Sequence, residues 1–157
     1  MSLFTASTAA EVEELVKQGH NVNARSVNRI TPLFQACLNN NIEVITALCV
    51  LGADVNAHYT YGETSLLACC RKGNVETIKL LLSFGANINK EDFLKRNILS
   101  CAVYNGSLEI TKYLVETCKM QVTFQIFRLA IVQLAVDIID CFLELGVNFN
   151  ELENDGM

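Results

Sequence analysis

The side chains best suited to nucleophilic chemistry in this chain are two histidines and seven cysteines. A cysteine nucleophile needs a base within reach, and a pair formed by His58 and Cys69 is conceivable. Cys69 stands in the apolar run "SLLACC", however, and a thiol buried on a packing face is ordinarily inert. We therefore expect no enzymatic activity and predict no catalytic residue.

Residue spacings typical of metal and phosphate sites are not found in the sequence. The cysteines form no Cys-x-x-Cys pair, and Cys69 and Cys70 are adjacent, which suits neither a zinc site nor an ordinary disulfide. The segment "CRKGN" lacks the order of a phosphate-binding loop, and no carboxylate spacing matches a calcium loop. We expect no metal and no cofactor. Reduced, buried cysteines acting as small apolar residues favour a reducing compartment, most simply the cytoplasm.

Charge and hydropathy restrict the class of partner. The net charge is −5, and no cluster of Lys and Arg is longer than a pair, which argues against nucleic acid because phosphate contacts supply much of that affinity. No apolar run reaches the roughly 20 residues that a membrane helix needs. The longest, near 131–139, is interrupted by Gln133 and Asp137. At 157 residues the chain has the size of about one domain, and we expect no membrane insertion.

A period of 33 residues runs through the chain. Glycines, asparagines and glutamates each recur at this step. They are Gly19, Gly52 and Gly85; Asn23, Asn56 and Asn89; and Glu43, Glu76 and Glu109. Several independent markers that keep one step identify an internal repeat.

Each period predicts two helices and an extended turn. The first helix is expected within 31–40, 64–73 and 97–106, and Asn40, Gly73 and Gly106 at their ends tolerate a left-handed conformation. Helical spacing of apolar residues predicts a second helix within 41–52, 74–85 and 107–118. Threonine hydroxyls, at Thr31 and Thr64, can cap the first helices. Neither helix can bury its apolar face alone, so the units must stack.

The 33-residue unit with "TPLFQAC" and "GADVNA" resembles the ankyrin repeat over almost the whole chain. The resemblance implies an all-α solenoid in which β-turn fingers and first helices form a concave surface. The family's signature His is replaced by Phe34, Leu67 and Ser100, and Pro32 is the one proline. In the family, Thr and His tie adjacent units by hydrogen bonds, so the resemblance implies a weakened network and a greater reliance on apolar packing.

We expect one ankyrin-repeat domain whose units differ at the two ends. The first unit should have a shortened first helix and act as a cap. In the fifth, five missing residues predict a collapsed finger near "CKMQVTFQ". Asn150 and Gly156 match finger positions, which suggests a fragment of a longer array. The expected units are 1–27, 28–60, 61–93, 94–121 and 122–150, with 151–157 as the start of a further unit or a tail.

The fingers and first helices are the expected binding surface. Their exposed positions hold aromatic, aliphatic and charged residues, a mixture that suits a protein partner. Tyr61 is a better candidate than Tyr59, and Tyr59 and Phe93 could instead pack finger on finger. We predict a monomeric protein-binding module; the alternative is a structural spacer within a longer array. The predicted contact residues are Arg25, Asn28, Ile30, His58, Tyr61, Glu63, Arg71, Lys72, Phe93, Arg96 and Tyr104.

Overall fold

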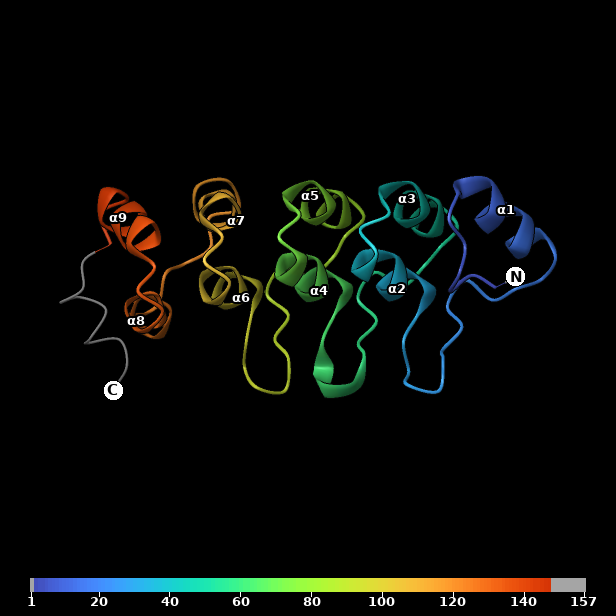
Figure 1. Ribbon diagram of the computed structural model, residues 1–157, viewed down its shortest axis with the longest axis horizontal. Coiled ribbons are helices and arrows are strands. Elements are labelled where there is room, and N and C mark those ends of the chain that lie inside the picture. Colours follow the sequence, from blue (N-terminus) through green and yellow to red (C-terminus); the bar gives the residue numbers. More distant parts are fainter. Residues whose placement is uncertain (1, 148–157) are drawn as a thin grey trace. The chain divides into compact units, whose positions relative to one another are not determined.

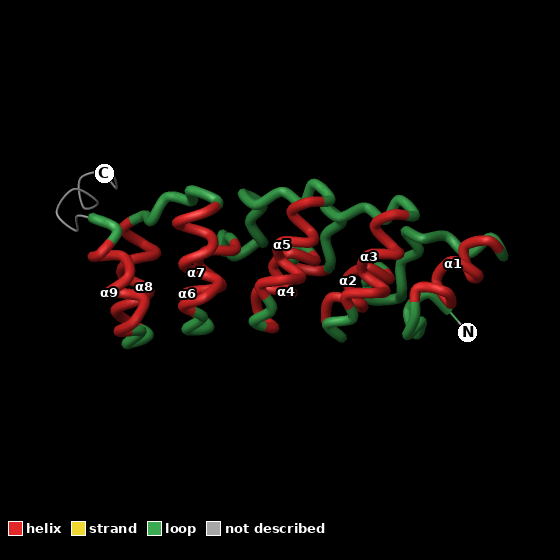
Figure 2. Tube along the Cα trace, turned by 90° about the horizontal axis from the view of Figure 1, so that it is seen from above, coloured by secondary structure: helices red, strands yellow, loops and turns green. Residues whose placement is uncertain are grey.

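The regular secondary structure is all helical in the part that the computed structural model describes, residues 2–147 (Figure 1). Figure 2 shows the helices joined by loops, with no strand in the described residues. The chain forms two compact units, residues 1–97 and 98–157. The predicted sixth segment, 151–157, and the finger positions Asn150 and Gly156 lie outside the described residues.

The first unit is built from pairs of antiparallel helices. Helix α2 packs against α3, and α4 against α5, while α2 also contacts α4 and α1 contacts α3. In Figure 1, α1, α3 and α5 form one row, α2 and α4 form a second, and the loops project as fingers from the side of the second row. The helix bounds are α1 (Ala9–Lys17), α2 (Pro32–Leu38), α3 (Ile42–Val50), α4 (Ser65–Lys72) and α5 (Val75–Ser83). The predicted all-α repeat is confirmed.

The helix ends follow from the residues that the repeat places there. The Thr31 hydroxyl accepts a hydrogen bond from the Phe34 N–H at 3.2 Å, and Thr64 caps α4 in the same way. Each cap satisfies one of the donors that the first turn of a helix leaves unpaired. At the other ends, Asn40 and Gly73 adopt the predicted positive φ, 54° and 76°. The period therefore marks both ends of each first helix.

The cysteines of the first unit are packing residues. Cys37, Cys69 and Cys70 are almost completely buried among aliphatic side chains, and all seven cysteines of the chain are free. Burial raises the pKa of the Cys49 thiol to about 12, with the neighbouring Cys37 adding to the shift. Thiols of this kind remain protonated and unreactive near neutral pH. The structural interpretation of these cysteines is confirmed.

Within residues 1–97, asparagine side chains join each repeat to the next one by hydrogen bonds. The Asn56 amide donates to the Gly85 carbonyl at 3.0 Å and accepts from the Asn87 N–H at 2.7 Å. Asn23, one period earlier, makes the same two contacts with residues 52 and 54 of the next unit. Loss of the signature His was expected to weaken the hydrogen bonding between units. These asparagines provide a separate tie that does not involve the His position, because one side chain supplies both a donor and an acceptor to backbone groups of its neighbour.

Replacing Asn56 with alanine should lower the free energy of unfolding by about 1–2 kcal/mol, because the Gly85 carbonyl after helix α5 loses its donor and the Asn87 N–H loses its acceptor. Asn56→Asp retains the acceptor and loses the donor, so its loss should be smaller. Urea denaturation followed by circular dichroism measures both. Equal stability of Asn56→Ala and the wild-type chain would show that water replaces the tie at no cost.

The first repeat, predicted as residues 1–27, begins differently from the prediction. The shortened first helix expected before α1 is not a helix: a single turn closes through the Thr5 N–H and the Ser2 carbonyl at 3.0 Å. Helix α1 stacks on α3, as the second helix of a unit does.

The second unit contains two further helix pairs. Helix α6 contacts α7 and α8, and α9 contacts α7 and α8. Residues 118–123 connect the pairs directly, so the finger predicted to collapse near this segment is replaced by a short link. The rings of Phe127 and Phe142 meet in the core at 6.1 Å. The bounds are α6 (Ile98–Tyr104), α7 (Leu108–Lys112) with a wider turn at Tyr113–Thr117, α8 (Phe124–Val132) and α9 (Val136–Glu144).

Candidate functional site

Three fingers of the first unit, residues 24–31, 57–64 and 90–97, close with one backbone pattern. In the second finger the Tyr59 N–H donates to the Glu63 carbonyl at 2.8 Å, and the Gly62 N–H donates to the Tyr59 carbonyl at 3.1 Å. The first and third fingers make the same two bonds. The residue that donates the second of these bonds has a positive φ in every finger: Arg29, Gly62 and Lys95. The fold thus fixes the turn and leaves the finger side chains free to differ.

The residue that begins the turn differs between the three fingers, and its side chain makes a different contact in each. The Ser26 hydroxyl accepts from the Ile30 N–H at 3.2 Å, and the Asp92 carboxylate accepts from the N–H groups of Leu94 and Arg96. Tyr59 occupies this position in the second finger, and its ring packs against Phe34 at 5.1 Å. The second finger has therefore exchanged a side-chain acceptor for an aromatic contact with α2.

Tyr61, at the tip of the second finger, has an uncommon backbone conformation. Its φ is 73°, a region that bulky side chains rarely adopt. Its carbonyl accepts a hydrogen bond from the Phe93 N–H at 2.9 Å, which links the second and third fingers. The side chain itself is 69% exposed. Residues held in sparsely populated conformations cluster at ligand-binding sites, so this conformation marks the finger tip as a candidate site.

These fingers border a groove of about 630 Å³ over helices α2 and α4. Its volume lies within the roughly 300–1,000 Å³ of typical ligand pockets. Phe34 is buried, whereas Tyr61 and Phe93 stay largely exposed at the finger tips. The lining is mostly aromatic and aliphatic, with three charged side chains. The residues are Ile30, Phe34, Leu38, Tyr59, Tyr61, Glu63, Arg71, Phe93, Leu94 and Arg96.

Two ion pairs form the polar part of the groove. Arg71 on α4 lies 3.0 Å from the Glu63 carboxylate, and Arg96 lies 2.6 Å from Asp92. Burial raises the pKa of Glu63, although the positive charges of Arg71 and Arg96 partly offset that rise. Burial acts on the Asp92 pKa in the same direction, but the hydrogen bonds from Arg96 and Leu94 outweigh it and lower the pKa. Both carboxylates therefore have arginine neighbours that favour their charged forms.

The groove brings together six of the residues predicted as contacts: Ile30, Tyr61, Glu63, Arg71, Phe93 and Arg96. Arg25 lies elsewhere and donates to the His58 carbonyl at 3.1 Å, which joins the first finger to the second. The Asn28 carbonyl accepts from the Thr60 hydroxyl in the same finger pair. Lys72 is exposed at the end of α4. Tyr104 is exposed at the end of α6 and belongs to the second unit.

Four lining residues were missing from the predicted contacts: Phe34, Leu38, Tyr59 and Leu94. Phe34 had been noted as the replacement for the family's His, and Tyr59 as an alternative packing residue. The sequence did contain a signal for this contact: Phe34 and Tyr59 are aromatic at two positions where the repeat usually has a polar residue. In the structure the two rings pack against each other. The alternative for Tyr59 was packing of finger on finger, whereas its ring packs against Phe34 of helix α2 and lines the groove.

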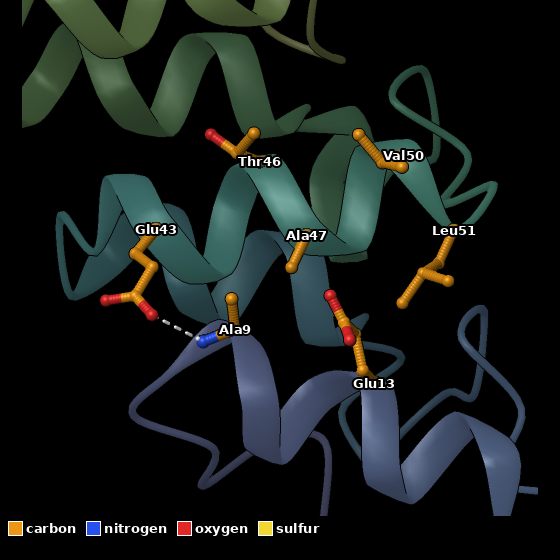
Figure 3. Close-up of a pocket in the computed structure, with 7 residues that line it drawn as sticks. All are labelled: Ala9, Glu13, Glu43, Thr46, Ala47, Val50 and Leu51. Atoms are coloured by element: carbon orange, nitrogen blue, oxygen red, sulfur yellow. Dashed lines mark hydrogen bonds between the residues drawn. The ribbon is translucent and has the colours of Figure 1, made fainter.

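A second groove, of about 370 Å³, lies between α1 and α3 (Figure 3). Ala9, Ala47 and Val50 line it together with the carboxylates of Glu13 and Glu43. Glu43 has a structural role, because it accepts a hydrogen bond from the Ala9 N–H at 2.8 Å and so caps the start of α1. With no aromatic side chain in its lining, this groove is a weaker candidate for recognition.

Comparison with known families identifies the architecture. A family model described as ankyrin repeats, in three copies, matches residues 3–92 and residues 33–126. The chain is an ankyrin-repeat protein. A search of curated proteins gave no significant match. Ankyrin repeats are generally protein–protein interaction modules and are typically not catalytic.

Two further findings concern this ankyrin-repeat protein. Across residues 2–147, no helix has both the length and the apolar character needed to span a bilayer. In the same part of the chain, no group of three or more His, Cys, Asp and Glu side chains is placed to hold a metal ion.

Proposed function

We propose that this ankyrin-repeat protein binds a protein partner through the groove between its second and third fingers and helices α2 and α4. The observation that carries the proposal is the pair of exposed aromatic side chains, Tyr61 and Phe93, at the mouth of a mostly apolar groove. Exposed aromatic residues beside an arginine have the composition of interface hot spots.

The backbone supports recognition by these two residues. The hydrogen bond between the Phe93 N–H and the Tyr61 carbonyl holds the two finger tips together. Their side chains can therefore be ordered before a partner arrives, which lowers the entropy lost on binding. Seven free cysteines support action of the protein in the reducing cytoplasm, and we propose that it acts there as a monomer.

Affinity capture from a native lysate tests this function. The wild-type chain should retain a specific protein that the double variant Tyr61→Ala/Phe93→Ala retains at least about tenfold less, as expected for truncated hot spots. Val132→Ala is the control, because it also removes an exposed apolar side chain but from α8, and Val132 lines neither groove. Circular dichroism should show the same helix content in all three proteins.

Two outcomes would contradict the proposal. If the double variant captures the same proteins as the wild-type chain, the binding surface lies elsewhere. If no variant captures a specific protein, the result favours the spacer role within a longer array.

A further inference from the structure

The charged residues of the first unit are segregated between its two sides. The fingers and helix α4 carry seven basic and three acidic residues, whereas helices α1, α3 and α5 carry five acidic and two basic residues. The finger side is therefore basic in a chain whose net charge is −5. The basic residues are Arg25, Arg29, Arg71, Lys72, Lys90, Lys95 and Arg96, and the acidic ones are Glu63, Glu91 and Asp92.

Inside the groove, burial of the acidic side chains increases the excess of exposed positive charge. The Arg71 side chain is 52% exposed, whereas its partner Glu63 is 15% exposed. Arg96 and Asp92 repeat the arrangement, with 53% and 3% exposed. Each carboxylate lies beneath its arginine, so a molecule entering the groove meets guanidinium groups before it meets carboxylates.

The two arginines are also held in place before binding. The Arg96 Nε donates to Asp92 at 2.7 Å, and the Arg71 Nη2 lies 3.0 Å from Glu63. A guanidinium has five N–H donors in a fixed planar arrangement, so the half-exposed Arg71 can bind Glu63 along one edge and a ligand along another. Ile30, Leu38 and the aromatic rings form the apolar part of the groove wall.

We propose that the groove selects an acidic peptide segment of its protein partner, one that carries an aromatic or branched aliphatic side chain next to a carboxylate. The apolar side chain enters between Phe34, Tyr61 and Phe93, and the carboxylate accepts hydrogen bonds from Arg71 and Arg96. This proposal rests on the proposed function and adds the chemical class of the partner. A nucleic acid fits less well, because a phosphate backbone needs a row of basic groups, whereas among the described residues the groove lining holds only two, each paired with a carboxylate.

Selection from a random peptide library displayed on phage tests the proposal, with the full 157-residue chain as the immobilised protein. The peptides retained should be enriched in Asp and Glu beside Phe, Tyr, Trp, Leu or Ile. The affinity of a selected peptide is then measured by fluorescence anisotropy. Arg71→Gln should weaken it about tenfold, the loss expected for a charge-assisted hydrogen bond. Lys79→Gln is the matched control, since it removes one positive charge from α5 and should leave the affinity unchanged.

A second variant keeps the test valid if Arg71→Gln disturbs the fold. The double exchange Glu63→Arg/Arg71→Glu keeps an ion pair but presents the carboxylate outward, so selection should then favour basic peptides. Selected peptides that need Tyr61 and Phe93 but are neutral or basic would overturn the acidic class and leave the proposed function intact. Peptides that bind equally well to Tyr61→Ala/Phe93→Ala, or no enrichment at all, would count against both. Tighter binding of a single-stranded DNA oligonucleotide than of any selected peptide would replace the peptide class.

Discussion

Replacing Asp92 with alanine should lower the free energy of unfolding by about 2–3 kcal/mol. The Asp92 carboxylate is almost completely buried and organises the third finger. It accepts hydrogen bonds from the Leu94 N–H at 2.9 Å and the Arg96 N–H at 3.0 Å, and it also pairs with the Arg96 guanidinium. Alanine removes these contacts together and leaves two backbone donors without their acceptor. Urea denaturation gives the change in unfolding free energy.

Asp92→Asn separates the two parts of this effect. The asparagine oxygen can still accept from the backbone N–H groups, whereas the charge that attracts Arg96 is lost. We expect a loss of about 1 kcal/mol, between the wild-type chain and the alanine variant. If both variants lose the same amount, the ion pair carries the stability and the backbone contacts add little.

The stability contributed by Asp92 should depend on pH in a defined direction. Its pKa in the folded protein is lower than in the unfolded chain, where about 3.9 is expected. The contribution is therefore fully present above the unfolded-state pKa and is lost as the pH falls through the folded-state pKa. The stability difference between the wild-type chain and Asp92→Asn should be constant near neutral pH and shrink below about pH 4.

Replacing Gly62 with alanine should also cost about 2–3 kcal/mol, from two separate causes. Gly62 has a φ of 77°, a conformation in which a Cβ atom is unfavourable. A Cβ at this position would also lie 2.6 Å from Cδ1 of the Phe93 ring and 3.1 Å from the Phe93 backbone nitrogen. The ring can rotate away, but the backbone of the third finger must shift. The substitution should therefore weaken peptide binding in the groove as well as stability.

Gly73 provides the control for the backbone part of this cost. Its φ is 76°, almost the same as that of Gly62, but nothing lies within 4 Å of a Cβ added there. Gly73→Ala should cost about 1 kcal/mol and leave the groove unchanged. Thermal denaturation of both variants, with peptide anisotropy as the second readout, compares them. Equal effects of the two substitutions would show that Phe93 does not constrain the second finger.

The helices could be predicted from the sequence because their ends are coded locally. Thr31 and Thr64 mark starts, and Asn40 and Gly73 mark ends, each through a contact within a few residues. The fingers were predictable as loops for the same reason. The exposed position of Tyr61 followed from the 33-residue register together with the resemblance to ankyrin fingers, although its role in binding remains a prediction.

The groove could be predicted only in part, because its details depend on contacts between units. Arg25 looks like a free surface cation in the sequence, yet it reaches the His58 carbonyl one period away. The contact of Tyr59 with Phe34, and the burial of Glu63 and Asp92 beneath their arginines, also require neighbouring units to be stacked. Local patterns do not contain this information. Asn56 is similar, since the period showed that it recurs but not which backbone groups it binds.

Because the three fingers close with the same backbone hydrogen bonds, the sequence of one finger can be replaced by that of another. Each finger ends its turn with the same two backbone hydrogen bonds, whatever side chains lie between. A substitution or recombination in one finger can therefore alter recognition while the helices and their stacking remain as they are. This freedom applies to the exposed finger positions, because inward-facing finger residues such as Tyr59 and Asp92 also support the fold. It also makes this chain a scaffold in which a selected loop can be grafted into the second finger without redesigning the helices.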